Sequence, residues 1–271
     1  MKVAKALTIA GSDSGGGAGI QADLKTFQEL GVYGMSAITA VTAQNTRGVQ
    51  GIYPLTPAAV AEQINSVASD LAPDAVKTGM LFSSEMMKET AVQVKQHHMK
   101  NLVVDPVMIA KGGAVLLEEE AIRTLKEYLL PLALVVTPNI PEAEKITGLA
   151  IHSISDRKEA AKMMHAYGAT YVVVKGGHAE EHGDEIVDLL YDGYMFTELT
   201  GRRVDTVHTH GTGCTFAAAM TAGLALDFSI PEAALLARRY VQAALEHPLG
   251  LGQGHGPTNH WAYKRQEKVN I

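Results

Sequence analysis

The segment Thr209–Thr215 joins a glycine-rich loop to the start of a helix made of small residues. Successive backbone N–H groups at such a helix start attract an anion. Cys214 falls in the first helical turn, where the helix dipole lowers the pKa of a thiol, and His210 is close enough in sequence to add a positive charge. We therefore expect an anion hole beside a reactive thiol here. The alternative is that Cys214 is a small buried hydrophobic residue.

A second glycine-rich loop, residues 11–19, follows the first expected strand and contains five glycines and Asp13. It lacks the G-K-[ST] tripeptide of a P-loop, and a hydrolase elbow needs serine where Asp13 stands. The spacing from Gly17 through Gly19 to Ala22 matches a dinucleotide-binding turn, but the acidic residue that binds the ribose is missing. The loop therefore predicts close backbone approach to a polar ligand, with a ligand-free tight turn as the alternative.

Gln44 ends the second expected strand. Its carboxamide offers a hydrogen-bond donor and an acceptor side by side, which matches the edge of an aminopyrimidine ring. Taken alone, the residue is more typical of a solvated turn.

Polar residues also follow the later strands. Asp105 and Glu142 come after two strands, where paired carboxylates can hold a hydrated Mg²⁺; each could also be a helix cap. Asn139 is placed to cap the helix that starts near Pro141. Lys175 precedes two glycines and suits a phosphate, although a β-turn would have a similar sequence.

Short apolar runs alternate with longer periodic segments along the chain, which predicts a mostly parallel sheet with helices on both faces. The expected strands are 6–9, 37–41, 75–78, 102–104, 134–136 and 171–174, and 186–190 with 194–199 forms an antiparallel edge hairpin. The expected helices are 18–30, 57–70, 83–98, 118–130, 156–167, 213–226 and 231–246. We expect one three-layer α-β-α sandwich domain over residues 1–271. Ligands then bind outside the carboxyl ends of the strands.

Composition narrows the function classes. Lys plus Arg is 23 and Asp plus Glu is 29, a net charge of −6, which argues against a broad nucleic-acid surface. The single cysteine excludes an internal disulfide and a multi-cysteine zinc site, and indicates a reducing, cytoplasmic environment. No apolar run has the ~18 residues that a membrane span needs.

Taken together, these motifs resemble the ribokinase-like superfamily, and within it the bacterial hydroxymethylpyrimidine/phosphomethylpyrimidine kinases of thiamine biosynthesis. The resemblance extends over nearly the whole chain. The matching segments are Ala6–Asp13, Gly19–Thr26, Ala43–Val49, Lys77–Leu81, Asp105–Met108, Thr137–Asn139, Thr209–Thr215 and Gly254–His260.

The resemblance implies phosphorylation of 4-amino-5-hydroxymethyl-2-methylpyrimidine and of its monophosphate, with ATP and Mg²⁺, by a homodimer. It implies that Gln44 binds the aminopyrimidine edge and that the ring pocket is lined by Gly11, Ala18, Asp23, Met80 and Val107. Asp105 and Glu142 would hold Mg²⁺, and the nucleotide would contact Asn139, Lys175, Gly177 and Gly213. The anion hole would be Gly211, Thr212 and Gly213. Sugar kinases of the superfamily carry an aspartate base at the position of Cys214, so this thiol becomes the expected base or hydroxyl-positioning group.

Three alternatives remain open from the sequence. Pyridoxal kinases share the fold, but pyridoxal has no amino group for Gln44 to recognise. A dinucleotide-dependent oxidoreductase would leave the loop at Gly211 without a role. A non-catalytic metabolite-binding protein would not need the anion hole or the carboxylate pair.

Overall fold

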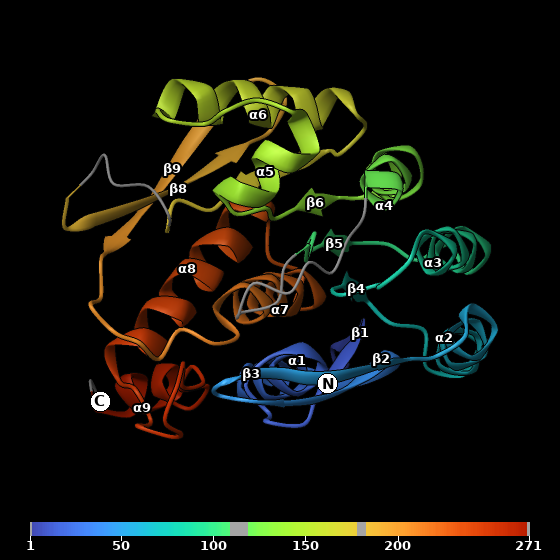
Figure 1. Cartoon of the computed structure of the whole chain (residues 1–271), viewed down its shortest axis with the longest axis horizontal. Coiled ribbons are helices and arrows are strands. Elements are labelled where there is room, and N and C mark those ends of the chain that lie inside the picture. The colour runs from blue at the N-terminus through green and yellow to red at the C-terminus, as the bar shows by residue number, and fades with distance from the viewer. Residues whose placement is uncertain (1, 109–118, 178–182, 270–271) are drawn as a thin grey trace.

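A nine-stranded sheet forms the centre of the computed structural model, which describes residues 2–108, 119–177 and 183–269. The strand order is β3-β2-β1-β4-β5-β6-β7-β8-β9. The strands are β1 Lys5–Asp13, β2 Tyr33–Asn45, β3 Gly48–Pro54, β4 Ala75–Thr78, β5 Leu102–Val104, β6 Val135–Val136, β7 Tyr171–Val174, β8 Glu185–Tyr191 and β9 Phe196–Arg202. Strands β2, β1, β4, β5, β6 and β7 are parallel, and antiparallel strands occupy both edges (Figure 1).

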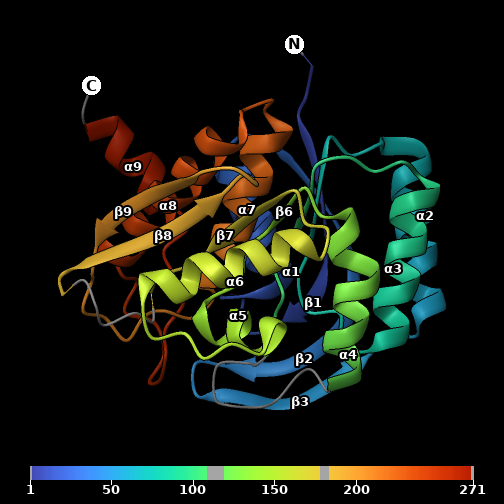
Figure 2. The same cartoon turned by 90° about the horizontal axis from the view of Figure 1, so that it is seen from above.

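Helices cover both faces of the sheet. The helices are α1 Gly19–Glu29, α2 Pro57–Leu71, α3 Ser84–Gln96, α4 Glu119–Thr124, α5 Ile140–Thr147, α6 Ile154–Ala166, α7 Thr212–Ala225, α8 Ile230–Glu246 and α9 Ala262–Val269. One hydrophobic core lies beneath α2–α6 and includes Leu7 and Ile9 of β1. The other lies beneath α1, α7 and α8 and includes Ala6. In Figure 2 the helices over the first of these cores lie side by side in the order α6, α4, α3 and α2.

This architecture confirms the expected three-layer α/β fold with a mostly parallel sheet and the β8–β9 edge hairpin. The sequence missed β3, whose residues are mostly half-exposed and include two glycines. It also missed α9, and it placed one continuous helix over 118–130. Residue 118 lies outside the described residues, and the rest divides into α4, a π-helical turn at Leu125–Leu129 and a 3₁₀ turn at Leu130–Leu132. Pro131 explains this division, because it lacks the N–H that an α-helix interior requires.

Helix α7 lies almost wholly inside the molecule, against α1, α8 and strands β1, β4 and β5. Five alanines and Gly223 are among its eleven buried residues, and Gly223 packs on Ala233 of α8 so closely that a Cβ there would collide. Small residues thus let a helix end reach the carboxyl edge of the central strands. The N-terminus of α7 is thereby fixed at the place where an α/β sheet binds its ligand.

Among the described residues, none of the helices combines the length and the apolar character that crossing a membrane would require.

Candidate active site

A cavity of about 720 Å³ opens along the carboxyl ends of the parallel strands. Fifteen of the sixteen site residues expected from the sequence line it. They are Gly11, Ala18, Gln44, Met80, Asp105, Val107, Asn139, Glu142, Lys175, Gly177, His210, Gly211, Thr212, Gly213 and Cys214. The sixteenth, Asp23, lies outside this wall. The residues come from strands, loops and helix starts up to 203 positions apart in sequence (Gly11 to Cys214), so the fold brings together two glycine loops, the carboxylates and the thiol.

The anion loop, residues 209–214, enters α7 through Gly211, which has a φ of +83°. A Cβ at Gly211 would collide with the carbonyl oxygen of Gly17, so glycine is needed both for the backbone conformation and for contact between the two glycine loops. The Thr212 hydroxyl donates to the Thr209 carbonyl at 2.8 Å and holds the turn. Gly211, Thr212 and Gly213 line the cavity at this helix start, and the Thr212 N–H donates to the Thr209 carbonyl at 3.3 Å. A helix start beside a cavity is a typical anion site.

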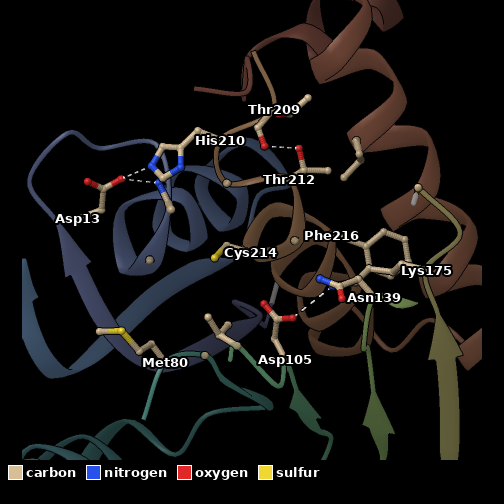
Figure 3. Close-up of a pocket in the computed structure, with 18 of the residues that line it drawn as sticks. Asp13, Met80, Asp105, Asn139, Lys175, Thr209, His210, Thr212, Cys214 and Phe216 are labelled. Carbon is tan, nitrogen blue, oxygen red and sulfur yellow. Dashed lines mark hydrogen bonds and ion pairs between the residues drawn. The ribbon is translucent and has the colours of Figure 1, made fainter. Parts of the chain in front are cut away.

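Cys214 lies at the middle of the site, between the His210 side and the Asp105 side (Figure 3). The expectation that its pKa is lowered is wrong. Burial raises the pKa of the thiol to about 11, although the Lys77 ammonium and the N–H of Gly19 act in the opposite direction. Cys214 is therefore a neutral thiol at physiological pH, because desolvation outweighs the helix dipole and the nearby cation.

The His210 side chain is paired with Asp13. Its Nε2 lies 2.8 Å from Asp13 Oδ2, and Figure 3 shows the two side chains facing each other. Gln44 Nε2 lies 3.3 Å from the same ring nitrogen. Burial alone would raise the pKa of Asp13, but the bond from His210 and backbone N–H groups of the first glycine loop lower it. His210 thus connects the anion loop to the residues around Gln44.

Asp105 and Lys175 face each other on the opposite side of Cys214, with Lys175 Nζ 3.3 Å from Asp105 Oδ1. Burial would lower the pKa of Lys175, but Asp105 and Glu142 outweigh it and raise that pKa, so the lysine is charged. Burial also raises the pKa of Glu142 to about 7. Asn139 and Glu142 form a reciprocal capping box at the start of α5, as the sequence suggested for Asn139.

Lys77 is a cavity residue that our reasoning from the sequence did not single out. Its ammonium is fully buried and lies 2.9 Å from Asp23 Oδ2, which also accepts from the Thr8 hydroxyl at 2.6 Å. Asp23, expected in the ring pocket, therefore lies behind Lys77 and holds its charge. The signal was available, because a lysine within a fully buried strand such as β4 needs a buried partner.

The wall near Gln44 is largely apolar. Met80 packs against Gly11 so tightly that a Cβ at Gly11 would overlap the methionine methyl group. Ala18 and Val107 line the same cavity. A flat ring can therefore lie between small and flexible apolar groups, with the Gln44 amide at its edge.

The chain matches a family model described as phosphomethylpyrimidine kinase over residues 13–259. The protein belongs to this family. It is 58% identical to the hydroxymethylpyrimidine/phosphomethylpyrimidine kinase of Bacillus subtilis, over 98% of this chain and 97% of that one. It is 43% identical to the pyridoxine kinase of the same organism, over 99% of this chain and 100% of that one. The Staphylococcus aureus pyridoxal kinase structure with ADP superposes with a TM-score of 0.91, at 41% identity, covering 98% and 96% of the two chains. The family assignment confirms the resemblance seen in the sequence.

Proposed function

We propose that this kinase transfers the γ-phosphoryl group of ATP to the hydroxymethyl group of 4-amino-5-hydroxymethyl-2-methylpyrimidine, and then phosphorylates the monophosphate. The observation that carries the proposal is the position of Gln44 in the same cavity as Cys214 and the anion loop. Its amide can pair with an amino group and a ring nitrogen together, which few small alcohols offer. The 58% identity to a kinase of that name supports the same substrate.

The two ends of the cavity suit the two substrates. Gly11, Ala18, Met80 and Val107 would hold the pyrimidine ring beside Gln44. At the other end, Asn139, Lys175, Gly177 and Gly213 would contact the nucleotide phosphates. The pyridoxal kinase of the same fold that was solved in complex with ADP supports nucleotide binding. The nucleobase would lie on the apolar wall formed by Ile186, Val204, Phe216, Val241 and Leu245. Cys214 and the anion loop lie between these two ends.

The carboxylates of this site fit Mg²⁺. Asp105 Oδ2 is buried and has no hydrogen-bond partner among the described residues, so it is available as a ligand. Glu142 lines the same cavity, whereas no group of three or more His, Cys, Asp or Glu in the described part of the chain could form a protein cage. Mg²⁺ commonly keeps several waters and uses few carboxylates together with substrate phosphates. Bound there, it would neutralise charge on the transferring phosphoryl group.

The remaining groups would stabilise charge and position the alcohol. Phosphoryl transfer depends mostly on positioning and electrostatic stabilisation. The N–H groups of Gly211, Thr212 and Gly213 would bind the transferring phosphoryl oxygens, and the charged Lys175 would neutralise them. The raised pKa of Cys214 favours a role in orienting the substrate hydroxyl over that of a preformed thiolate base.

Pyridoxal kinase activity is the second candidate, because a pyridoxine kinase shares 43% identity with this chain. Replacing Gln44 with leucine separates the two. We expect the KM for hydroxymethylpyrimidine to rise about 5- to 150-fold, since an unpaired polar ligand edge costs roughly 1–3 kcal/mol. The KM for ATP should stay within about twofold. An unchanged pyrimidine KM would remove Gln44 from ring recognition.

The oligomeric state and the cellular compartment are also proposals. The exposed side chains of Tyr33, Val41 and Tyr53 on β2 and β3 support a homodimer formed at this sheet edge. Sedimentation of the wild type should show a dimer, and the charge introduced by Tyr53→Lys should weaken it. A monomeric wild type would contradict the proposed dimer.

The reducing cytoplasm is the proposed compartment, because Cys214 has no second cysteine with which to pair.

A further inference from the structure

The Gln44 carboxamide lies between two polar side chains. The structure places its nitrogen 3.3 Å from His210 Nε2 and its oxygen 3.2 Å from Thr42 Oγ1. The two ends of a carboxamide are nearly identical in shape, so the surrounding donors and acceptors decide which end is which. The orientation matters because Gln44 is the group that reads the edge of the ring.

The first of these partners acts as a donor. His210 Nε2 lies 2.8 Å from Asp13 Oδ2, and that carboxylate also accepts from the N–H groups of Gly15, Gly17 and Ala18 at 2.8–3.0 Å. These bonds lower the pKa of Asp13, so the carboxyl group is ionised and can only accept. The ring nitrogen must therefore carry the proton, and it cannot also accept a hydrogen bond from an amide N–H.

The second partner acts as an acceptor. The Thr42 hydroxyl has one proton to donate. Its oxygen lies 2.9 Å from the Ser12 carbonyl oxygen, which can only accept a hydrogen bond. If the Gln44 oxygen also faced Thr42, one proton would have to serve two acceptors. An amide nitrogen at the same place would donate to the free lone pairs of the hydroxyl.

Turning the amide by half a rotation improves both contacts. At Thr42 the hydroxyl proton is left to the Ser12 carbonyl. At His210 the ring N–H no longer faces an amide N–H, and its single proton is shared between Asp13 and the Gln44 oxygen in a bifurcated hydrogen bond. We infer that the Gln44 oxygen faces His210 and its nitrogen faces Thr42, and that His210, held by Asp13, is the positioning residue that fixes this orientation. The inference rests on the proposed function and deepens it. The remaining lone pair of the oxygen and the second amide proton then point to the ligand. A ring bound there places its amino group on the His210 side and its acceptor nitrogen on the Thr42 side.

His210 is itself held firmly in place. Its backbone N–H donates to the Gly256 carbonyl at 3.0 Å, and its carbonyl accepts from Thr258 N–H at 3.1 Å. The imidazole lies directly against Gly17, where a Cβ would overlap the ring. His210 also belongs to the anion loop, so the same loop holds the side chain beside Gln44 and the phosphoryl-binding N–H groups.

A double-mutant cycle tests this role. His210→Met removes the ring N–H while keeping a long apolar side chain, and we expect the KM for hydroxymethylpyrimidine to rise about 5- to 10-fold, the cost of one hydrogen bond. The KM for ATP should change by less than about twofold. In a Gln44→Leu background, the same His210→Met change should alter the pyrimidine KM by less than about twofold, because the residue through which His210 acts is absent.

Matched variants complete the test. His210→Gln keeps an N–H at similar reach and should recover most of the lost pyrimidine affinity. Equal effects of His210→Met in both backgrounds, or no effect in either, would overturn the inference. If His210→Met does not fold, Thr42→Val replaces it in the cycle with the same two outcomes. Failure of the wild type to phosphorylate hydroxymethylpyrimidine would instead overturn the proposed function, so the two failures are distinguishable.

Discussion

Alkylation of Cys214 reports directly on the electrostatics at the centre of the site. The chain has one cysteine, so iodoacetamide can add one carbamidomethyl group there, and the intact mass follows the reaction without mapping. The thiolate is the reacting form. A pKa of about 11 against the usual 9.0 makes the thiolate fraction at pH 8 about a hundredfold smaller than that of an ordinary cysteine.

The alkylation rate of the folded protein should rise about tenfold per pH unit from pH 7 to pH 9 and show no plateau in that range. Urea-unfolded protein should react about a hundredfold faster at pH 8, reach half its maximal rate near pH 9 and level off above that pH. Cys214→Ser is the matched control and should take up no label. Circular dichroism at each pH confirms that the fold persists. A plateau below pH 9 in the folded protein would refute the account, because it would show that the dipole and Lys77 outweigh burial.

Three further predictions concern activity, stability and the metal. Cys214→Ala should lower kcat by at least about tenfold with little change in either KM, measured by steady-state ADP release; full activity would remove the thiol from the reaction. Lys77→Met should lower the free energy of unfolding in urea by about 3–5 kcal/mol, because it leaves the Asp23 carboxylate buried and unpaired, and adding Asp23→Leu should restore much of the loss. Mg²⁺ should bind about tenfold more tightly at pH 8 than at pH 6, measured by titration calorimetry with ADP present, because the pKa of Glu142 is about 7 and the metal needs the ionised form. Glu142→Gln should remove that pH dependence; a wild-type affinity that is flat with pH would contradict the role of Glu142.

Much of the fold was predictable because buried parallel strands have a strong sequence signal. The strands Ala75–Thr78 and Tyr171–Val174 were located to the residue. Strand β3 was missed because half-exposed edge residues with two glycines do not alternate clearly between apolar and polar. Here pairing with β2, which sequence cannot show, determines the structure.

The site was predictable as a set of loops but not as a set of contacts. Polar residues after buried strands mark the carboxyl edge of the sheet, which is why Asp105, Glu142 and Gln44 were found. Which residues pair across that edge depends on strand order. His210 is 197 positions from Asp13, and nothing local indicates their bond.

The pKa of Cys214 is raised where the sequence predicted a lowered value, and this difference also comes from packing that the sequence does not show. Its place at a helix start was readable from the glycines before it, and the helix dipole argument follows from that position. Desolvation acts against the helix dipole and raises the pKa of the thiol. Its size depends on how deeply α7 is inserted among α1, α8 and the central strands. Depth of burial is a property of the packed molecule, so position along the chain gave the wrong sign.

The most direct test of the central claim is ADP release by the purified wild-type protein with Mg²⁺ and ATP, comparing hydroxymethylpyrimidine, its monophosphate and pyridoxal as acceptors. The account predicts turnover with both pyrimidines and a kcat/KM for hydroxymethylpyrimidine at least about tenfold above that for pyridoxal, since the Gln44 amide has a partner only on the pyrimidine edge. Preference for pyridoxal, or no turnover of hydroxymethylpyrimidine, would contradict it.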